Sequence, residues 1–150
     1  MTQQPIARRV LDIDAPAAEV WAVISDPWEL GYISRVRKVE RADGDVRVVH
    51  IGYEGVEGYA DVQIAYERVF DIDHAAHTYK YSWSGDYLPI ADHVATVKIH
   101  ETGPATSRFE WSCVWRLTEP WPAEQERELA QSVEDIWWTG MTRVKEIAEG

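Results

Sequence analysis

Seven stretches of the chain alternate apolar and polar residues with the period of two that is typical of β-strands. They cover about residues 6–13, 34–41, 46–53, 59–70, 77–83, 90–102 and 106–118. Turn-forming residues separate them, and in the tight turn at 42–45 Gly44 can adopt the positive φ that a hairpin requires. The pattern predicts a sheet of seven strands that takes up most of the chain.

The C-terminal part, residues 123–149, has the periodicity of a helix, and acidic residues in its first turn suit the positive end of the helix dipole. Gly140 either allows close packing of this helix on a strand or leaves space for a ligand. Trp138 and Met141 either cover a pocket mouth, pack on the outside, or contact a second subunit in a homodimer. At about 100° per residue, one stripe is expected to face the sheet: Leu129, Val133, Ile136, Trp137, Gly140, Val144 and Ile147.

Two short helices are expected between the first two strands, where residues 13–33 read IDAPAAEVWAVISDPWELGYI. Pro16 occupies a position at which a helix accepts a residue without an amide proton, which predicts a helix at 17–24. Pro27 ends this helix, because the residue before a proline is pushed out of the helical region. A second short helix is then expected at 28–33.

This segment resembles the opening of the START-related, birch-pollen-allergen-like superfamily (SRPBCC), whose polyketide cyclase/dehydrase branch carries a comparable strand, A-P-x-x-x-V-W helix and Asp-Pro turn. The resemblance implies an α+β helix-grip fold, with a curved seven-stranded antiparallel sheet wrapped around a long C-terminal helix. It also implies a ligand cavity between sheet and helix. It carries over no catalytic residues, because the matching motif lies in the supporting helices.

Length and charge narrow the class of protein. The 150 residues suit one domain, 1–150. A net charge of -11 argues against binding to nucleic acid and against adsorption to anionic membranes. Cys113 is the only cysteine, which fits a reducing compartment, and the first residues lack an apolar run that could be a signal peptide or membrane span. We therefore expect a cytoplasmic protein.

Eight Trp and seven Tyr against two Phe indicate either a Trp-rich core or a cavity lined for a ligand. In the last three strands charged residues mark the outer side, so the opposite faces should form a concave wall. Tyr and Trp on this wall favour a ring-shaped, partly oxygenated ligand. The inner side of strand 46–53 remains undecided. The expected ligand-binding residues are Trp83, Val97, Trp111, Trp115, Trp137, Gly140 and Met141.

Five residues are candidates for chemistry. His93 can act as an acid or base near pH 7, or can be a structural histidine at a strand end. Tyr66, Tyr79 and Tyr81 can orient a carbonyl or phenol, or can be hydrogen-bonded core residues. Arg68, if it turns inward, can hold a carboxylate or polarise an enolate, and otherwise is a surface arginine.

Other kinds of site have little support. Asp71, Asp73, His74 and His77 do not have the spacing of a known zinc site, and no dinucleotide fingerprint or Ser-His-Asp order is present. We therefore expect no metal and no cofactor. Cys113 has bulky apolar neighbours and is expected in the core.

One hairpin holds five of the fifteen basic residues. Its outward members can form a positive patch that receives an acidic acyl carrier protein bearing a substrate, or can simply be paired with nearby carboxylates. The five residues are Arg35, Arg37, Lys38, Arg41 and Arg47.

We therefore expect a protein that binds a small hydrophobic, aromatic or polyketide-like molecule in an internal cavity. Whether it is an enzyme stays open: it either acts as a cyclase or dehydratase, or is a non-catalytic carrier or sensor of a hydrophobic ligand or lipid. A partner-binding module with a filled core is the third interpretation.

Overall fold

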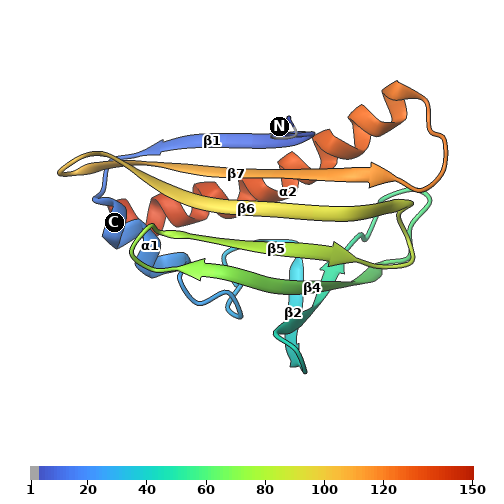
Figure 1. Cartoon of the computed structure of the whole chain (residues 1–150), viewed down its shortest axis with the longest axis horizontal. Coiled ribbons are helices and arrows are strands. Elements are labelled where there is room, and N and C mark those ends of the chain that lie inside the picture. The colour runs from blue at the N-terminus through green and yellow to red at the C-terminus, as the bar shows by residue number, and fades with distance from the viewer. Residues whose placement is uncertain (1–3) are drawn as a thin grey trace.

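The computed structural model describes residues 4–150 and contains a seven-stranded antiparallel sheet in the order β1-β7-β6-β5-β4-β3-β2 (Figure 1). The first strand therefore lies beside the last, and the others follow as a meander of hairpins. The strands are β1 (Ala7–Ile13), β2 (Val36–Ala42), β3 (Val46–Gly52), β4 (Val62–Asp73), β5 (Thr78–Ser84), β6 (Ile90–Gly103) and β7 (Thr106–Leu117).

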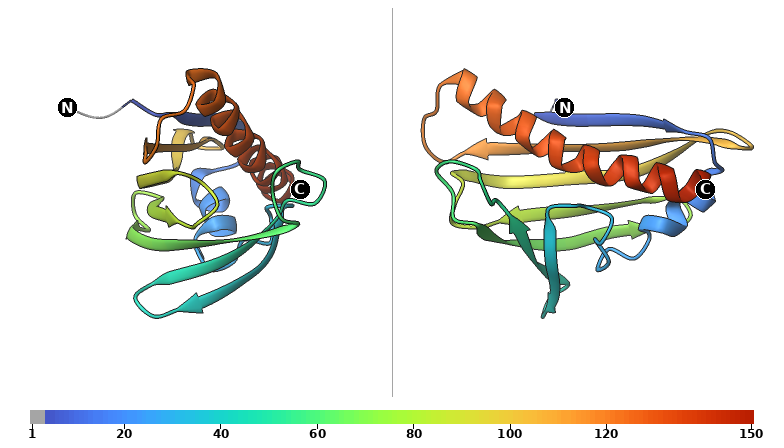
Figure 2. Two further views of the ribbon diagram at one scale, coloured as in Figure 1. Left: turned by 90° about the vertical axis from the view of Figure 1, so that its right-hand side faces the viewer. Right: turned by 180° about the vertical axis from the view of Figure 1, so that it is seen from behind.

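Two helices complete the fold, α1 (Ala17–Ile24) and α2 (Ala123–Glu149). The sheet curves around α2, and α1 packs against α2 and against β6 and β7 at one end (Figure 2). This arrangement is the helix-grip fold that the sequence predicts. Of the helices in residues 4–150, neither is long and apolar enough to cross a membrane.

The expected second short helix at 28–33 is absent, and residues 25–35 form turns. Leu30, Tyr32 and Ile33 are all buried. In a helix, Leu30 and Tyr32 would point in nearly opposite directions, because two residues correspond to about 200° of rotation. A series of turns lets both side chains enter the core.

The buried side of α2 is rotated relative to the predicted stripe. Met141 is fully buried in the core, and Ile147 is 44% exposed. The predicted stripe included Leu129, Val133 and Ile136, which are only half-buried. Some apolar residues of α2 are thus fully buried in the core, whereas others are only half-buried. Periodicity alone does not separate these two groups, and it therefore predicts a single stripe.

Gly140 permits close packing. A Cβ atom at this position would lie 2.9 Å from Cγ1 of Ile33 and 3.2 Å from Cδ2 of Tyr32. Such distances are too short for carbon atoms without movement of the neighbours. The glycine therefore lets α2 approach the turn segment that precedes β2, rather than a strand.

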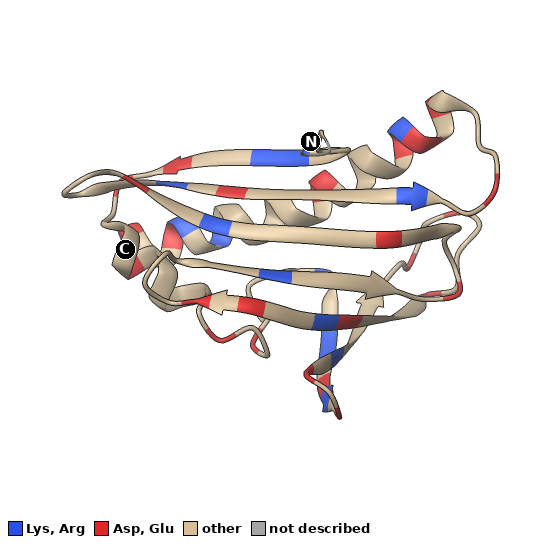
Figure 3. Cartoon of the chain, viewed as in Figure 1, with Lys and Arg blue, Asp and Glu red and all other residues tan. Residues whose placement is uncertain are grey.

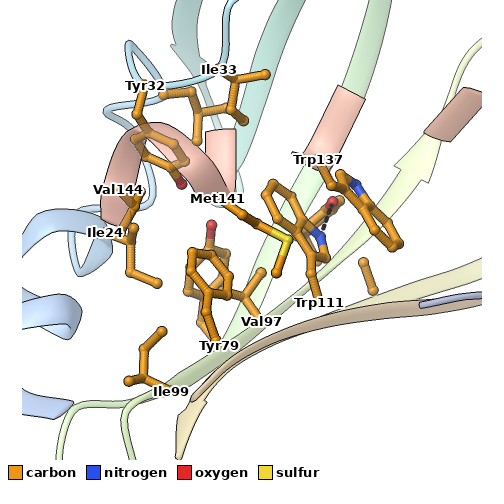
Figure 4. Close-up of a cluster of buried hydrophobic side chains, with 14 of the residues drawn as sticks. Ile24, Tyr32, Ile33, Tyr79, Val97, Ile99, Trp111, Trp137, Met141 and Val144 are labelled. Carbon is orange, nitrogen blue, oxygen red and sulfur yellow. Dashed lines mark hydrogen bonds between the residues drawn. The ribbon is translucent and has the colours of Figure 1, made fainter. Parts of the chain in front are cut away.

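The space between α2 and the sheet is filled at the end near α1. Tyr79, Met141 and Val144 meet there with side chains from α1 and β6 (Figure 4). All three side chains are inaccessible to solvent. Burial of a side chain of this size contributes about 1.5–3 kcal/mol to the free energy of folding, relative to leaving it exposed. Any open space between α2 and the sheet therefore lies toward the other end.

Candidate functional site

A cavity of about 90 Å³ lies between α2 and the inner faces of β3 to β7. Most of its lining is apolar, with a small number of polar side chains. This combination is typical of small-molecule sites. The lining residues are Leu30, Ile33, Val36, Arg47, Val49, Ile51, Tyr53, Glu67, Tyr81, Trp83, Tyr87, Leu88, Ile90, His93, Trp111, Trp115, Leu129, Val133, Ile136 and Trp137.

Two stacked indole rings form one wall of this cavity. The rings of Trp111 on β7 and Trp137 on α2 lie 5.1 Å apart with an angle of 11° between their planes (Figure 4). Trp111 also stacks on Phe109, at 6.1 Å. Trp83 and Trp115 line the cavity as well. The four tryptophans predicted to bind a ligand are thus brought to one cavity.

A buried ion pair forms the polar part of the lining. The Nε atom of Arg47 donates to Oε1 of Glu67 over 2.8 Å, and the two residues are 1% and 8% exposed. They face each other directly in the β3–β4 register. The Nη1 atom of Arg47 also donates to the backbone carbonyl of Pro27 and, at 3.5 Å, to the hydroxyl of Tyr79.

The guanidinium of Arg47 stays charged in this setting. Burial lowers its pKa, but interactions with Tyr79 and with the Glu67 carboxylate outweigh that effect, so the net direction is upward. The guanidinium carbon also lies 4.6 Å from the ring centre of Tyr81. Arg47 is therefore held by charge, hydrogen bonds and aromatic rings together.

Tyr81 joins the polar and aromatic parts of the wall. Its hydroxyl oxygen accepts a hydrogen bond from Nε1 of Trp111 over 3.0 Å, which is the dashed line in Figure 4. Burial raises the pKa of Tyr81 well above its usual value, so the phenol is neutral. The hydroxyl still carries its own proton as a donor.

His93 lines the cavity from β6 and is 7% exposed. Its Nδ1 accepts a hydrogen bond from the backbone N–H of Trp83 over 3.0 Å. The proton of the neutral ring therefore sits on Nε2. Burial lowers the pKa of His93 to about 4, so at neutral pH the ring is a hydrogen-bond donor and a weak base.

His93 should make stability depend on pH between about 6.5 and 4. Its pKa of about 4 in the folded protein lies below the ordinary 6.5, so the unfolded chain takes up the proton first as the pH falls. The contribution of neutral His93 is fully present above pH 6.5 and is lost toward pH 4, a loss on the order of 3 kcal/mol.

Urea unfolding at pH 7.5 and pH 5 measures this effect. The parent protein should lose clearly more free energy of unfolding over that interval than the His93→Gln variant, which has no titrating group at position 93. Equal losses in the two proteins would contradict the assigned cause.

Half-exposed aromatic residues from two loops form the mouth of the cavity. Tyr53 follows β3 and Tyr87 follows β5, and their rings lie 5.8 Å apart. Tyr59 packs on Tyr53 at 5.1 Å, and Tyr87 packs edge-on against Trp83 at 5.3 Å. No pattern in the sequence indicates this group.

The size of the cavity bears on what can enter it. An apolar cavity of about 150 Å³ takes up benzene, whereas the cavity here is about 90 Å³. An aromatic ligand must therefore widen the space. The mouth is the natural place for this change, because its loop residues are only half-buried.

Several predicted site residues lie outside the cavity lining. Val97, Tyr79 and Met141 are in the filled core near α1, and Gly140 contacts the turn segment before β2. Tyr79 still touches the site indirectly, through its hydroxyl and Arg47.

Tyr66 was a candidate for orienting a ligand and Arg68 a candidate only if it turned inward, and neither side chain faces the cavity. Both are exposed on the outer face, with Tyr66 at 48%. The inner face carries Ala65, Glu67 and Val69, which are buried. The outer residues of β4 are unusually apolar, so apolar content does not identify the inner face.

Basic and acidic residues are interspersed along the β2–β3 hairpin (Figure 3). Arg47 is buried in the cavity wall and cannot contribute to a surface patch. Arg37 pairs with Glu54, Lys38 with Glu40, and Arg41 with Asp45. Arg35 donates to the carbonyl of Gly52. The expected acyl carrier protein partner stays a prediction, now without Arg47.

The charged residues of the cavity lining that sequence reasoning missed are Arg47 and Glu67. The pairing of the strands was the signal that could have found them. The tight turn at 42–45 joins β2 to β3, and the chain reverses again before β4. In the resulting register Arg47 on β3 lies directly opposite Glu67 on β4. Opposite charges that face each other within apolar strands indicate a buried pair. The sequence pattern only places Arg47 with the other basic residues of its hairpin.

Two further expectations concern metals and thiols. Within residues 4–150, no group of three or more His, Cys, Asp or Glu side chains is placed to hold a metal ion. Cys113 is 2% exposed, and burial raises the pKa of its thiol to about 12. Its expected core position is confirmed.

Residues 4–149 match the model of a family described as polyketide cyclase / dehydrase and lipid transport. No curated protein sequence matches the chain.

Solved structures show the same fold. An uncharacterized protein from Bacillus thuringiensis matches with a TM-score of 0.76 at 19% identity, over 96% of this chain and 98% of that one. The Zhui aromatase/cyclase from Streptomyces sp. R1128 matches with 0.68 at 20% identity, over 95% and 92%. Norcoclaurine synthase from Thalictrum flavum, in complex with dopamine and hydroxybenzaldehyde, matches with 0.70 at 14% identity, over 98% and 93%.

Proposed function

The chain belongs to the polyketide cyclase/dehydrase and lipid transport family, and from this premise we propose that its cavity binds a small, hydrophobic, ring-containing molecule. The observation that carries the proposal is the cavity itself, with four tryptophans and a few polar groups in its lining. Flat indole faces suit a planar ring, which they can stack upon or meet edge-on.

The polar groups suit oxygen substituents on such a ring. His93 and Tyr81 can each donate a hydrogen bond, and one carboxylate oxygen of Glu67 can accept one. A phenol or ketone oxygen placed near them would satisfy groups whose burial is otherwise unfavourable. This supports an oxygenated aromatic or polyketide-like ligand over a purely hydrocarbon one.

A second candidate function is catalysis of cyclisation or dehydration. It is favoured by the charged pair Arg47–Glu67 in an otherwise apolar cavity, and by the fold shared with an aromatase/cyclase. Loss of water needs one group to accept a proton from carbon and another to protonate the departing hydroxyl. The Glu67 carboxylate is the available base, and the Tyr81 phenol can protonate the departing hydroxyl and then regain a proton from Glu67, while the Nε2–H of His93 holds the carbonyl oxygen.

A carrier or sensor would bind the same ligand and return it unchanged. Native mass spectrometry of freshly purified protein detects a retained ligand, and incubation with an aromatic β-hydroxy ketone shows whether water is lost. Glu67→Gln should abolish turnover if the protein is a dehydratase. Binding without any turnover would favour a carrier.

Filling the cavity should block binding. Val133 lines the cavity from α2 and is half-buried, so in Val133→Phe the added ring would occupy the space that a ligand needs. We expect at least about tenfold weaker binding of a planar aromatic ligand, equivalent to about 1.4 kcal/mol. The loss of folding stability should be small, because the ring enters existing space instead of a filled core.

Ile147→Phe is the matched control for this variant. Ile147 lies on the same helix, is exposed and does not line the cavity. Its substitution should leave the dissociation constant unchanged. Equal binding by parent, Val133→Phe and Ile147→Phe would place the ligand elsewhere and remove the proposal.

A further inference from the structure

The ionisable side chains in the cavity lining are one arginine, one glutamate, one histidine and three tyrosines. Arg47 is positive and Glu67 is its direct partner at 2.8 Å. His93 is a neutral donor, and the tyrosines are neutral phenols. The charges of the lining therefore sum to zero.

We infer that Glu67 is a specificity-determining residue, which cancels the charge of Arg47 and so makes the cavity select neutral, oxygen-bearing rings against carboxylates of the same shape. The inference rests on the proposed function, since it names the ligand class of that same cavity. Without Glu67, a buried arginine among apolar and aromatic residues would be a site for an anion.

Two of the three guanidinium nitrogens of Arg47 already have partners within the protein. Its Nε bonds the Glu67 carboxylate, and its Nη1 bonds the Pro27 carbonyl and the Tyr79 hydroxyl. A ligand carboxylate near the guanidinium would have to share it with a fixed carboxylate. Two like charges in one buried site disfavour each other strongly.

Burial strengthens this selection. Arg47 and Glu67 are almost inaccessible to solvent, so little water is present to screen an additional charge. A ligand carboxylate would leave its hydration behind and gain no uncompensated cation in return. The protein as a whole is also acidic, with a net charge of -11, which does not favour the approach of anions.

A neutral ligand brings no charge into the cavity and can use the donors and acceptors of its lining. A ketone oxygen can accept from the Nε2–H of His93, for which residues 4–150 supply no acceptor in the structure. A ring hydroxyl can donate to the second oxygen of Glu67. Neither interaction adds a net charge to the cavity, so the cost of desolvation is far smaller.

Matched pairs of ligands test the inference: acetophenone with benzoate, and 2-acetylnaphthalene with 2-naphthoate. Within each pair, a methyl group replaces a charged oxygen on the same framework. At pH 7.5, NMR titration of the parent protein should show the ketone binding at least about tenfold more tightly than the acid. An acid that binds as tightly as its ketone overturns the selectivity but leaves the binding function intact.

Glu67→Gln keeps the size of the side chain and leaves Arg47 uncompensated. It should increase the affinity for benzoate or 2-naphthoate at least about tenfold relative to the parent protein. Glu54→Gln is the control, because Glu54 pairs with Arg37 on the surface and should not affect selectivity. Unchanged preference in a folded Glu67→Gln protein overturns the role of Glu67.

Two outcomes keep the test decisive. If Glu67→Gln does not fold, the comparison of ketone and acid in the parent protein still decides the selectivity. If no member of either pair binds the parent protein, the proposed binding function fails, and the inference fails with it.

Discussion

Replacing Arg47 by methionine should lower the free energy of unfolding by about 3–5 kcal/mol, because it leaves the buried Glu67 carboxylate without its partner. The methylene groups of the side chain are largely retained, so loss of packing is the smaller part of the effect. Urea unfolding at pH 7.5 gives the change from the midpoint and slope of the transition.

The double variant Arg47→Met/Glu67→Met should recover most of that loss. Both charges are then absent, and a buried ion pair replaced by apolar side chains of similar volume is often neutral or stabilising. With the Glu67→Met single variant added, the two single variants and the double variant form a cycle that gives the coupling energy of the pair.

Arg116→Met is the matched control for the single variant. Arg116 forms an exposed ion pair with Asp92, over 2.8 Å. Exposed pairs of this kind contribute about 0–1 kcal/mol. A loss for Arg47→Met that is no larger than for Arg116→Met would show that the pair is not buried as described.

Replacing Trp111 by alanine should have a comparable effect, about 3–5 kcal/mol for loss of a buried aromatic side chain. Trp111 is 2% exposed, stacks on Phe109 and Trp137, and donates to the Tyr81 hydroxyl. The substitution removes both stacking contacts and leaves the hydroxyl without its donor. Trp111→Phe keeps part of the ring packing and should lose less.

Trp121→Ala controls for the removal of a large aromatic ring as such. Trp121 lies between β7 and α2, and its Nε1 bonds the carboxylate of exposed Glu119. We expect a loss well below half that of Trp111→Ala, since half-buried sites lose less packing. Equal losses would mean that Trp111 is not part of a close-packed wall.

The sequence predicted the fold well because periodicity reports directly on burial. Charged residues mark the outer faces of β6 and β7, so the inner positions of Val97 and Trp111 followed from alternation. The long helix was predicted with the bounds that it has, Ala123–Glu149, because prolines precede it and its acidic first turn marks the start. The resemblance then supplied the order of sheet and helix.

The inner face of β4 could not be predicted from alternation. Its outer side carries Val62, Ile64 and Tyr66, which look like a core face in isolation. Register decides the matter: Glu67 pairs with Trp83, and Val69 with Tyr81, so these partners share a face. A wall that includes a charged pair violates the simple rule that apolar positions face inward, and such violations are typical of functional sites.

The division of the interior into a filled part and a cavity was also beyond periodicity. Met141 and Val133 are both apolar residues of α2, yet the first packs in the core and the second borders the cavity. What separates them is the position of each along and around the helix relative to α1 and the sheet. That information is in the tertiary arrangement and not in the local pattern.

A single titration that follows the indole N–H signals of the eight tryptophans tests whether a planar aromatic molecule binds among the tryptophans of the cavity. Four of them line the cavity: Trp83, Trp111, Trp115 and Trp137. The other four serve as controls within the same spectrum: Trp21, Trp28, Trp121 and Trp138. Substitution of each tryptophan by phenylalanine assigns the signals.

With 2-acetylnaphthalene as the probe, the four cavity signals should shift together and saturate with one dissociation constant. The reason is that a bound aromatic ring changes the local magnetic field, and so the chemical shift, at each indole N–H of the lining. The control signals should stay in place or shift far less. Signals that do not move, or that move equally at all eight positions without saturation, would contradict the account.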